Sequence, residues 1–232
     1  MKMRIASLAL LTILCLALST PAFAGFVYSN GAINGTGFPG SAYYICCGTG
    51  FQVSNSFKVS VNSIMTGFTF GEWVPAGTVP TGISWAVGTT SFGGTLTPGG
   101  GFSTTLLCTN GSPYNGGICG GGFGYDVYES FATTGAIFLA AGTHYLTLAF
   151  ATDSGGTGFD GWDINFGNST AFCRPPACPT LSPQGDDQIP SESFTILGAA
   201  TGTTPEPSSI MLFGSGILGL VGVLRRKLNI HL

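Results

Sequence analysis

Hydrophobic and polar residues alternate along most of the chain. In FQVSNSFKVSV, residues 51–61, the odd positions are apolar except for Asn55, and the even positions are polar. This period of two is typical of a strand with one buried face, because successive side chains point to opposite sides of a sheet. Similar segments recur in IMTGFTFGEW, GISWAVGTT, YDVYESF, THYLTLAF and SFTILG.

Glycine-rich turn clusters separate these segments, for example Pro98–Gly101 and Gly120–Gly122. No stretch between Gly25 and Thr204 has the period of an amphipathic helix. We therefore predict that residues 25–198 form one all-β domain, an antiparallel β-sandwich with a jelly-roll-like connectivity. The Pro-rich segment 174–190 is expected to be a surface excursion, and residues 199–204 a flexible spacer.

The N-terminus does not follow this pattern. It combines a basic start, a long apolar run and a small-x-small triplet, namely Lys2 and Arg4, Ile5 to Leu18, and Ala22-Phe23-Ala24. This order is typical of a secretory signal peptide. We predict that signal peptidase removes residues 1–24, with Ala22 and Ala24 forming its cleavage site. The domain between the two ends is then exported.

A second apolar run lies near the C-terminus. Residues 210–224 contain no charge and are followed by Arg225, Arg226 and Lys227. At about 1.5 Å rise per residue such a helix spans roughly 22 Å, which suffices for a marginal single transmembrane helix. The basic cluster places residues 228–232 in the cytoplasm as a short tail, by the positive-inside rule.

Pro205, Glu206 and Pro207 directly precede this run. The triplet, the apolar helix and the Arg225-Arg226 pair together resemble the PEP-CTERM sorting signal of Gram-negative bacteria, over residues 205–227. The resemblance implies that an exosortase, a membrane-embedded transpeptidase, recognises the triplet while the helix and arginines hold it at membrane depth. It also implies an inner-membrane-tethered intermediate, delivery to the cell surface or extracellular matrix, and an association with exopolysaccharide. The domain resembles the middle region of uncharacterised PEP-CTERM proteins, which implies no activity.

Charge excludes one class of function. Between the two predicted signals, Lys58 and Arg174 are the only basic residues, against nine acidic ones. So acidic a domain is not expected to bind nucleic acid, because that interaction depends on basic contacts to phosphates.

Six cysteines remain after the predicted signal peptide, and an even number in an exported protein favours disulfides. The spacing predicts the local pairs Cys108–Cys119 and Cys173–Cys178. Cys46 and Cys47 are adjacent and need either a vicinal bridge or separate partners. A zinc site is disfavoured, because the spacings do not fit.

The exported segment offers little for catalysis. His144 is its only histidine, and no nucleophile-elbow motif is present. The acidic residues Glu72, Asp126, Glu129 and Asp163 are expected on solvated strand faces. We therefore predict a non-enzymatic cell-surface or matrix protein. A secreted hydrolase that uses two of these carboxylates is the third hypothesis.

The second hypothesis is a calcium-assisted carbohydrate-binding module associated with exopolysaccharide. It rests on DSGGTGFDGWD, in which Asp153, Asp160 and Asp163 could bind Ca²⁺, the one cofactor that the sequence suggests. Trp162, in the same predicted loop, could stack on a sugar. The competing interpretation is a turn rich in Asp and Gly between two strands.

Overall fold

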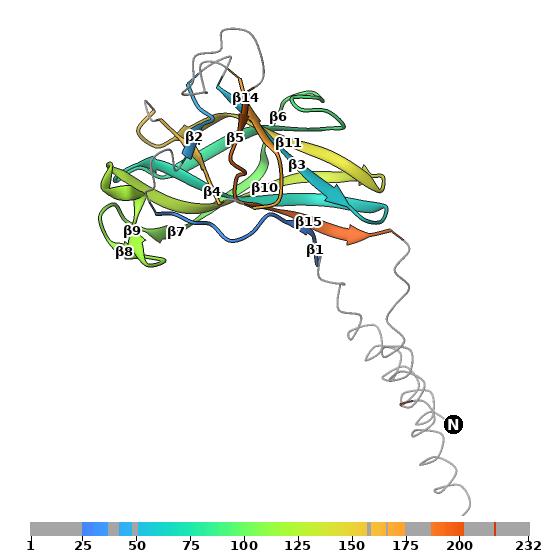
Figure 1. Ribbon diagram of the computed structural model, residues 1–232, viewed down its shortest axis with the longest axis horizontal. Coiled ribbons are helices and arrows are strands. Elements are labelled where there is room, and N and C mark those ends of the chain that lie inside the picture. The colour runs from blue at the N-terminus through green and yellow to red at the C-terminus, as the bar shows by residue number, and fades with distance from the viewer. Residues whose placement is uncertain are drawn as a thin grey trace, which may run out of the picture. The chain divides into compact units, whose positions relative to one another are not determined.

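The computed structural model describes residues 25–36, 42–47, 51–156, 159–165, 167–174, 187–201 and 216 (Figure 1). The predicted signal peptide, the spacer from residue 202 and almost all of the predicted sorting signal lie outside these residues. The described part is built of antiparallel strands and contains one short 3-10 turn, Gly120–Gly122. No helix in this part is long and apolar enough to cross a membrane.

The strands form two large sheets and one small hairpin. The first sheet has the order β1-β15-β4-β10-β7, and β12 pairs with β4 and with β2. Its strands are β1 (Gly25–Ser29), β2 (Ala42–Tyr44), β4 (Ser63–Pro75), β7 (Gly100–Cys108), β10 (Tyr125–Leu139), β12 (Gly161–Asp163) and β15 (Phe194–Ala200).

The second sheet has the order β14-β13-β3-β11-β5-β6. Its strands are β3 (Gln52–Val59), β5 (Pro80–Gly88), β6 (Thr97–Pro98), β11 (Gly142–Asp153), β13 (Ala171–Cys173) and β14 (Asp187–Ile189). The hairpin consists of β8 (Pro113–Tyr114) and β9 (Gly117–Ile118). Its loop is Asn115-Gly116, and both residues have positive φ, 44° and 78°, as a two-residue type I′ turn requires.

The main core lies between the two large sheets. Phe68 and Phe70 of β4 meet Trp85 of β5 and Leu146 and Leu148 of β11 in one buried cluster. Burying one such side chain completely stabilises the fold by about 1.5–3 kcal/mol. These are the apolar positions of the alternating segments, so the period-two prediction is confirmed.

A second, smaller core covers the other face of the first sheet. Trp73, Cys108, Cys119 and Val127 are its buried members. Residues 30–36, which we call the strap, follow β1 and contribute Ile33 to this core. The face of the first sheet that points away from the second sheet is therefore partly covered by the strap and by the β8–β9 hairpin.

The predicted all-β, antiparallel architecture is confirmed, and the jelly-roll connectivity stays a prediction. Three local expectations are wrong. The predicted turn Pro98–Gly101 contains the end of β6 and the start of β7, and β15 continues two residues into the predicted spacer, to Ala200. β12 lies in the predicted Asp/Gly loop, because its backbone pairs with β4 on one side and β2 on the other.

Gly71 lies on β4 directly beneath the strap. A Cβ atom there would come within 2.8 Å of Ile33 Cγ2 and 2.7 Å of Asp163 Cβ. We expect Gly71→Ala to lower the free energy of unfolding by about 1–3 kcal/mol, because the strap must move. Urea denaturation followed by tryptophan fluorescence measures this change. Gly82→Ala is the control, since its Cβ would be 3.2 Å from the flexible Thr152 side chain. Equal losses in both variants would contradict this explanation.

Candidate functional site

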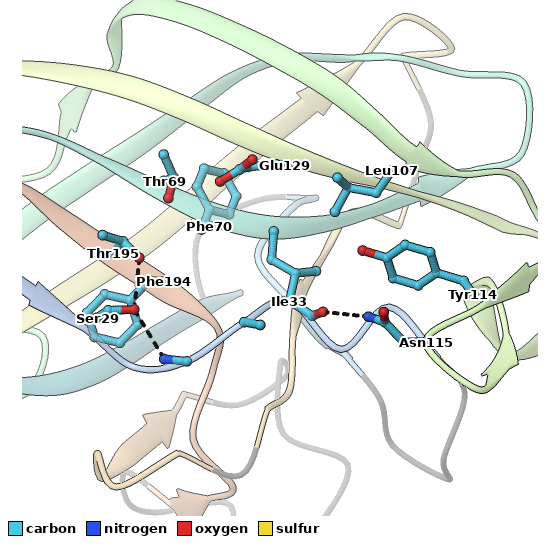
Figure 2. A pocket seen from close by; sticks show the side chains of 12 residues that line it. Ser29, Ile33, Thr69, Phe70, Leu107, Tyr114, Asn115, Glu129, Phe194 and Thr195 are labelled. Carbon is cyan, nitrogen blue, oxygen red and sulfur yellow. Dashed lines mark hydrogen bonds between the residues drawn. The ribbon is translucent and has the colours of Figure 1, made fainter. Parts of the chain in front are cut away.

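A pocket of about 510 Å³ opens on the strap side of the first sheet (Figure 2). Its lining comes from five parts of the chain that are distant in sequence: β1 with the strap, β4, the β7–β8 region, β10 and β15. Thr69 reaches the pocket because its neighbours Phe68 and Phe70 point into the main core, so that side chains at alternate positions face outward. Glu129 of β10 is exposed beside it.

Apolar and polar side chains share this pocket. Figure 2 shows the Tyr114 hydroxyl pointing towards the space between Ile33 and Leu107, while Thr69 and Glu129 lie beyond them. Ser29 and Thr195 form a hydroxyl pair at 3.1 Å. The pocket therefore offers hydrogen-bonding groups around a small apolar surface.

The walls of the pocket are tied to each other. The Asn115 amide donates to the carbonyl oxygens of Ile33 and Asn34 at 3.1 and 3.2 Å, which joins the hairpin loop to the strap. The Tyr114 ring packs on Gly35, where a Cβ would come within 2.7 Å of it and where φ is +64°, so only glycine fits. A disulfide between Cys108 and Cys119 fixes the hairpin to β7.

Asp163 holds the strap from the sheet side. Its carboxylate accepts hydrogen bonds from the backbone N–H groups of Asn34 and Gly35, at 2.7 and 2.8 Å, and from Trp73 Nε1 at 2.8 Å. The side chain is completely buried. Burial raises the pKa of Asp163 to about 6, although these hydrogen bonds oppose the shift.

Asp153 and Asp160 form a separate pair of buried carboxyl groups. Asp153 Oδ1 accepts the N–H groups of Gly155 and Gly156. Asp153 Oδ2 and Asp160 Oδ1 are buried and have no hydrogen-bond donor among the described residues. Burial and the neighbouring Asp153 carboxyl group raise the pKa of Asp160 to about 7.

The predicted calcium site is not assembled. The Asp163 carboxylate accepts hydrogen bonds from the strap and from Trp73, whereas Asp160 has Asp153 as its neighbouring acid. Within the described residues, no three His, Cys, Asp or Glu side chains are grouped so that they could hold a metal ion together.

Trp162 is not the exposed stacking surface that the sequence suggests. It is completely buried, its rings lie 6.3 Å from Phe70 and 5.7 Å from Phe194, and its Nε1 donates to the Ser193 carbonyl oxygen at 2.7 Å. The reason is that the predicted loop is strand β12, which pairs within the first sheet and directs alternate side chains into the core.

The expectation that the acidic residues lie on solvated faces holds only for Glu129. Glu72 is fully buried and accepts a hydrogen bond from Ser130 Oγ at 2.5 Å, and burial raises its pKa well above the usual value. Asp126 accepts the N–H groups of Gly77 and Asn110. His144 is also buried, with Nε2 2.8 Å from the Ala140 carbonyl oxygen.

The structure shows two of the disulfide pairings that the sequence leaves open. Cys46 and Cys47 form a vicinal disulfide, and Cys108 pairs with Cys119, as its spacing predicts. Cys173 is also disulfide-bonded, and Cys178, its predicted partner, lies outside the described residues. The pocket residues Tyr114 and Asn115 were not predicted, although Asn115-Gly116 is a recognisable hairpin-loop signal.

Comparison with known protein families identifies the C-terminal segment. Residues 203–227 match the PEP-CTERM protein-sorting motif, which confirms the resemblance seen at Pro205-Glu206-Pro207 and the apolar, Arg-ending segment after it. This motif implies an exported protein that an exosortase processes. No curated protein and no solved structure matches the chain.

We expect Asp163→Ala to destabilise the protein by about 3 kcal/mol or more, because three N–H donors, two of them in buried hydrogen bonds, lose their acceptor. Asp163→Asn retains one acceptor oxygen and should lose less. Urea unfolding of both variants measures the difference. If millimolar Ca²⁺ stabilised the wild type and not Asp163→Asn, Asp163 would be a metal ligand rather than the anchor of the strap.

Asp160 makes stability depend on pH. The pKa of Asp160 rises from 3.8 to about 7 on folding, so the folded protein binds this proton more tightly than the unfolded chain does. The resulting contribution to the free energy of unfolding is fully present below pH 3.8, declines between these values and is lost above about pH 7. We expect Asp160→Asn to raise the melting temperature at pH 8 by several degrees, with a smaller effect at pH 4.5. Glu129→Gln, at an exposed carboxylate, serves as the control. Parallel pH profiles for wild type and Asp160→Asn would contradict the raised pKa of Asp160.

Proposed function

We propose that the chain is a non-enzymatic protein of the cell surface or extracellular matrix, exported by its signal peptide and processed by an exosortase. The observation that carries this proposal is the sorting motif at residues 203–227, placed directly after an all-β domain. Signal peptidase and exosortase are its processing partners. Between the two processing steps, the apolar run at 210–224 tethers the protein to the inner membrane.

The disulfides support export. Within the described residues, Cys46–Cys47 and Cys108–Cys119 are bonded and Cys173 is bonded as well. Disulfides form and persist in oxidising compartments, and they are rare in cytosolic proteins. An exported destination is therefore consistent with both the tail and the domain.

The acidic side chains support a non-enzymatic role. Glycoside hydrolysis in its common form needs two carboxyl groups on opposite sides of the substrate. Glu129 is the one carboxylate that lines the pocket, whereas Glu72, Asp126 and Asp163 are buried and hydrogen-bonded to the protein itself. The hydrolase hypothesis therefore has no second acid at this pocket.

The calcium-assisted carbohydrate module, the second hypothesis, loses the site on which it rested. Trp162 is buried, Asp163 accepts hydrogen bonds from the strap and from Trp73, and no three possible metal ligands are grouped within the described residues. Any binding of exopolysaccharide by this domain would need a different surface.

Mass spectrometry of the C-terminus tests the main proposal. In cells with the exosortase, we expect the mature protein to lack the segment after the Pro205-Glu206-Pro207 region, and in cells without the enzyme to retain it. Glu206→Ala should block processing, because it removes the only charge of the recognition triplet. Glu129→Ala removes the same charge from the exported domain and should be processed normally. An intact tail in both strains would refute the proposal.

A further inference from the structure

We propose that the pocket of Figure 2 binds a neutral saccharide, with Glu129 and Asn115 accepting hydrogen bonds from its hydroxyl groups and Tyr114, Ile33 and Leu107 contacting its C–H face. This function goes beyond export and processing. It uses a different surface from the Asp153–Asp163 segment and requires no calcium.

The pocket has the size and rigidity of a ligand site. Its volume of about 510 Å³ falls within the range of roughly 300–1,000 Å³ typical of small-molecule sites. Its two walls are joined through the Asn115 amide and the packing of Tyr114 on Gly35, and the Cys108–Cys119 disulfide anchors the hairpin. A ligand would therefore meet a preformed surface, which lowers the entropic cost of binding.

Two acceptors in the pocket are not used by the protein. The Glu129 side chain makes no hydrogen bond or ion pair with any described residue, although its carboxylate faces the pocket. The Asn115 NH₂ group is occupied by the strap carbonyls, so its Oδ1 is left without a donor from the described residues. Acceptors of this kind match the hydroxyl groups of a sugar, and a charged acceptor forms the stronger bonds.

The apolar part of the pocket matches the other side of a sugar. Tyr114, Ile33 and Leu107 are each partly exposed in it. A pyranose ring presents C–H groups on its faces and hydroxyl groups at its edge, so it needs both kinds of surface. A purely apolar ligand would leave the Glu129 carboxylate without a partner, which costs free energy on desolvation.

Charge selects against acidic ligands. None of the lining residues is basic. Lys58 is on β3 of the second sheet, and the Arg174 guanidinium, which follows β13 of that sheet, lies 4.2 Å from the centre of the Phe92 ring. Glu129 would repel a uronate or a phosphate. The pocket should therefore discriminate between a neutral sugar and its uronic acid counterpart.

Calorimetry on the processed, exported protein tests this inference. The probes are maltose, cellobiose, lactose and chitobiose as neutral disaccharides, and digalacturonic acid as the acidic one. We expect at least one neutral probe to bind in the absence of calcium and the acidic probe not to bind. Glu129→Gln should weaken the binding by about tenfold or more, since it removes a charged acceptor without changing the shape.

Two further variants separate binding from folding. Tyr114→Phe keeps the packing on Gly35 and should change affinity less than Glu129→Gln. Phe138→Ala removes an exposed aromatic ring at the far end of β10, outside the pocket, and should bind as the wild type does. The inference is overturned if no neutral probe gives heat, if digalacturonic acid binds more tightly, or if Glu129→Gln binds as tightly as the wild type.

Discussion

The buried carboxylate of Asp163 is the contact on which the strap side of the first sheet depends. It joins three elements at one point: the strap through Asn34 and Gly35, β4 through Trp73, and its own strand β12. Burying a carboxylate is unfavourable, and the raised pKa of Asp163 reflects this cost. The three donors offset it, because each would otherwise be an unsatisfied N–H group beneath the strap. The second core, the hydrogen bonds of Asn115 and the pocket all include strap residues, so each of them requires the strap to be in place.

The same solution recurs elsewhere, because the exported segment has only two basic side chains to pair with its acids. Asp126 accepts two backbone N–H groups, Glu72 accepts the Ser130 hydroxyl, and Asp153 accepts the N–H groups of Gly155 and Gly156. Acids whose pKa is raised by burial, as it is in Glu72 and Asp160, favour the folded state most at low pH. A domain built in this way is better suited to mildly acidic surroundings than to alkaline ones.

The sequence predicted the strands of the main core well, because alternate burial leaves a direct trace in residues such as Phe68, Phe70, Leu146 and Leu148. It failed on β7 and β12, where Gly and Thr dominate or the strand is only three residues long. The burial of Trp162 and of the acidic side chains could not be predicted, because the charge and size of a residue do not reveal which hydrogen-bond partner a distant segment supplies. The pocket was missed for the same reason, since Ser29, Thr69 and Glu129 meet only in the folded sheet.

The division between tail and domain is compatible with the binding role proposed for this domain. The sorting motif at residues 203–227 implies export and processing, and it is separate in sequence from the residues that line the pocket. In the proposed role the domain acts through what its pocket contacts, and the Glu129 carboxylate in the lining orients the ligand. The rigidity contributed by Asp163, Asn115 and the Cys108–Cys119 disulfide then serves recognition, because a preformed site binds a weakly interacting ligand at a lower entropic cost.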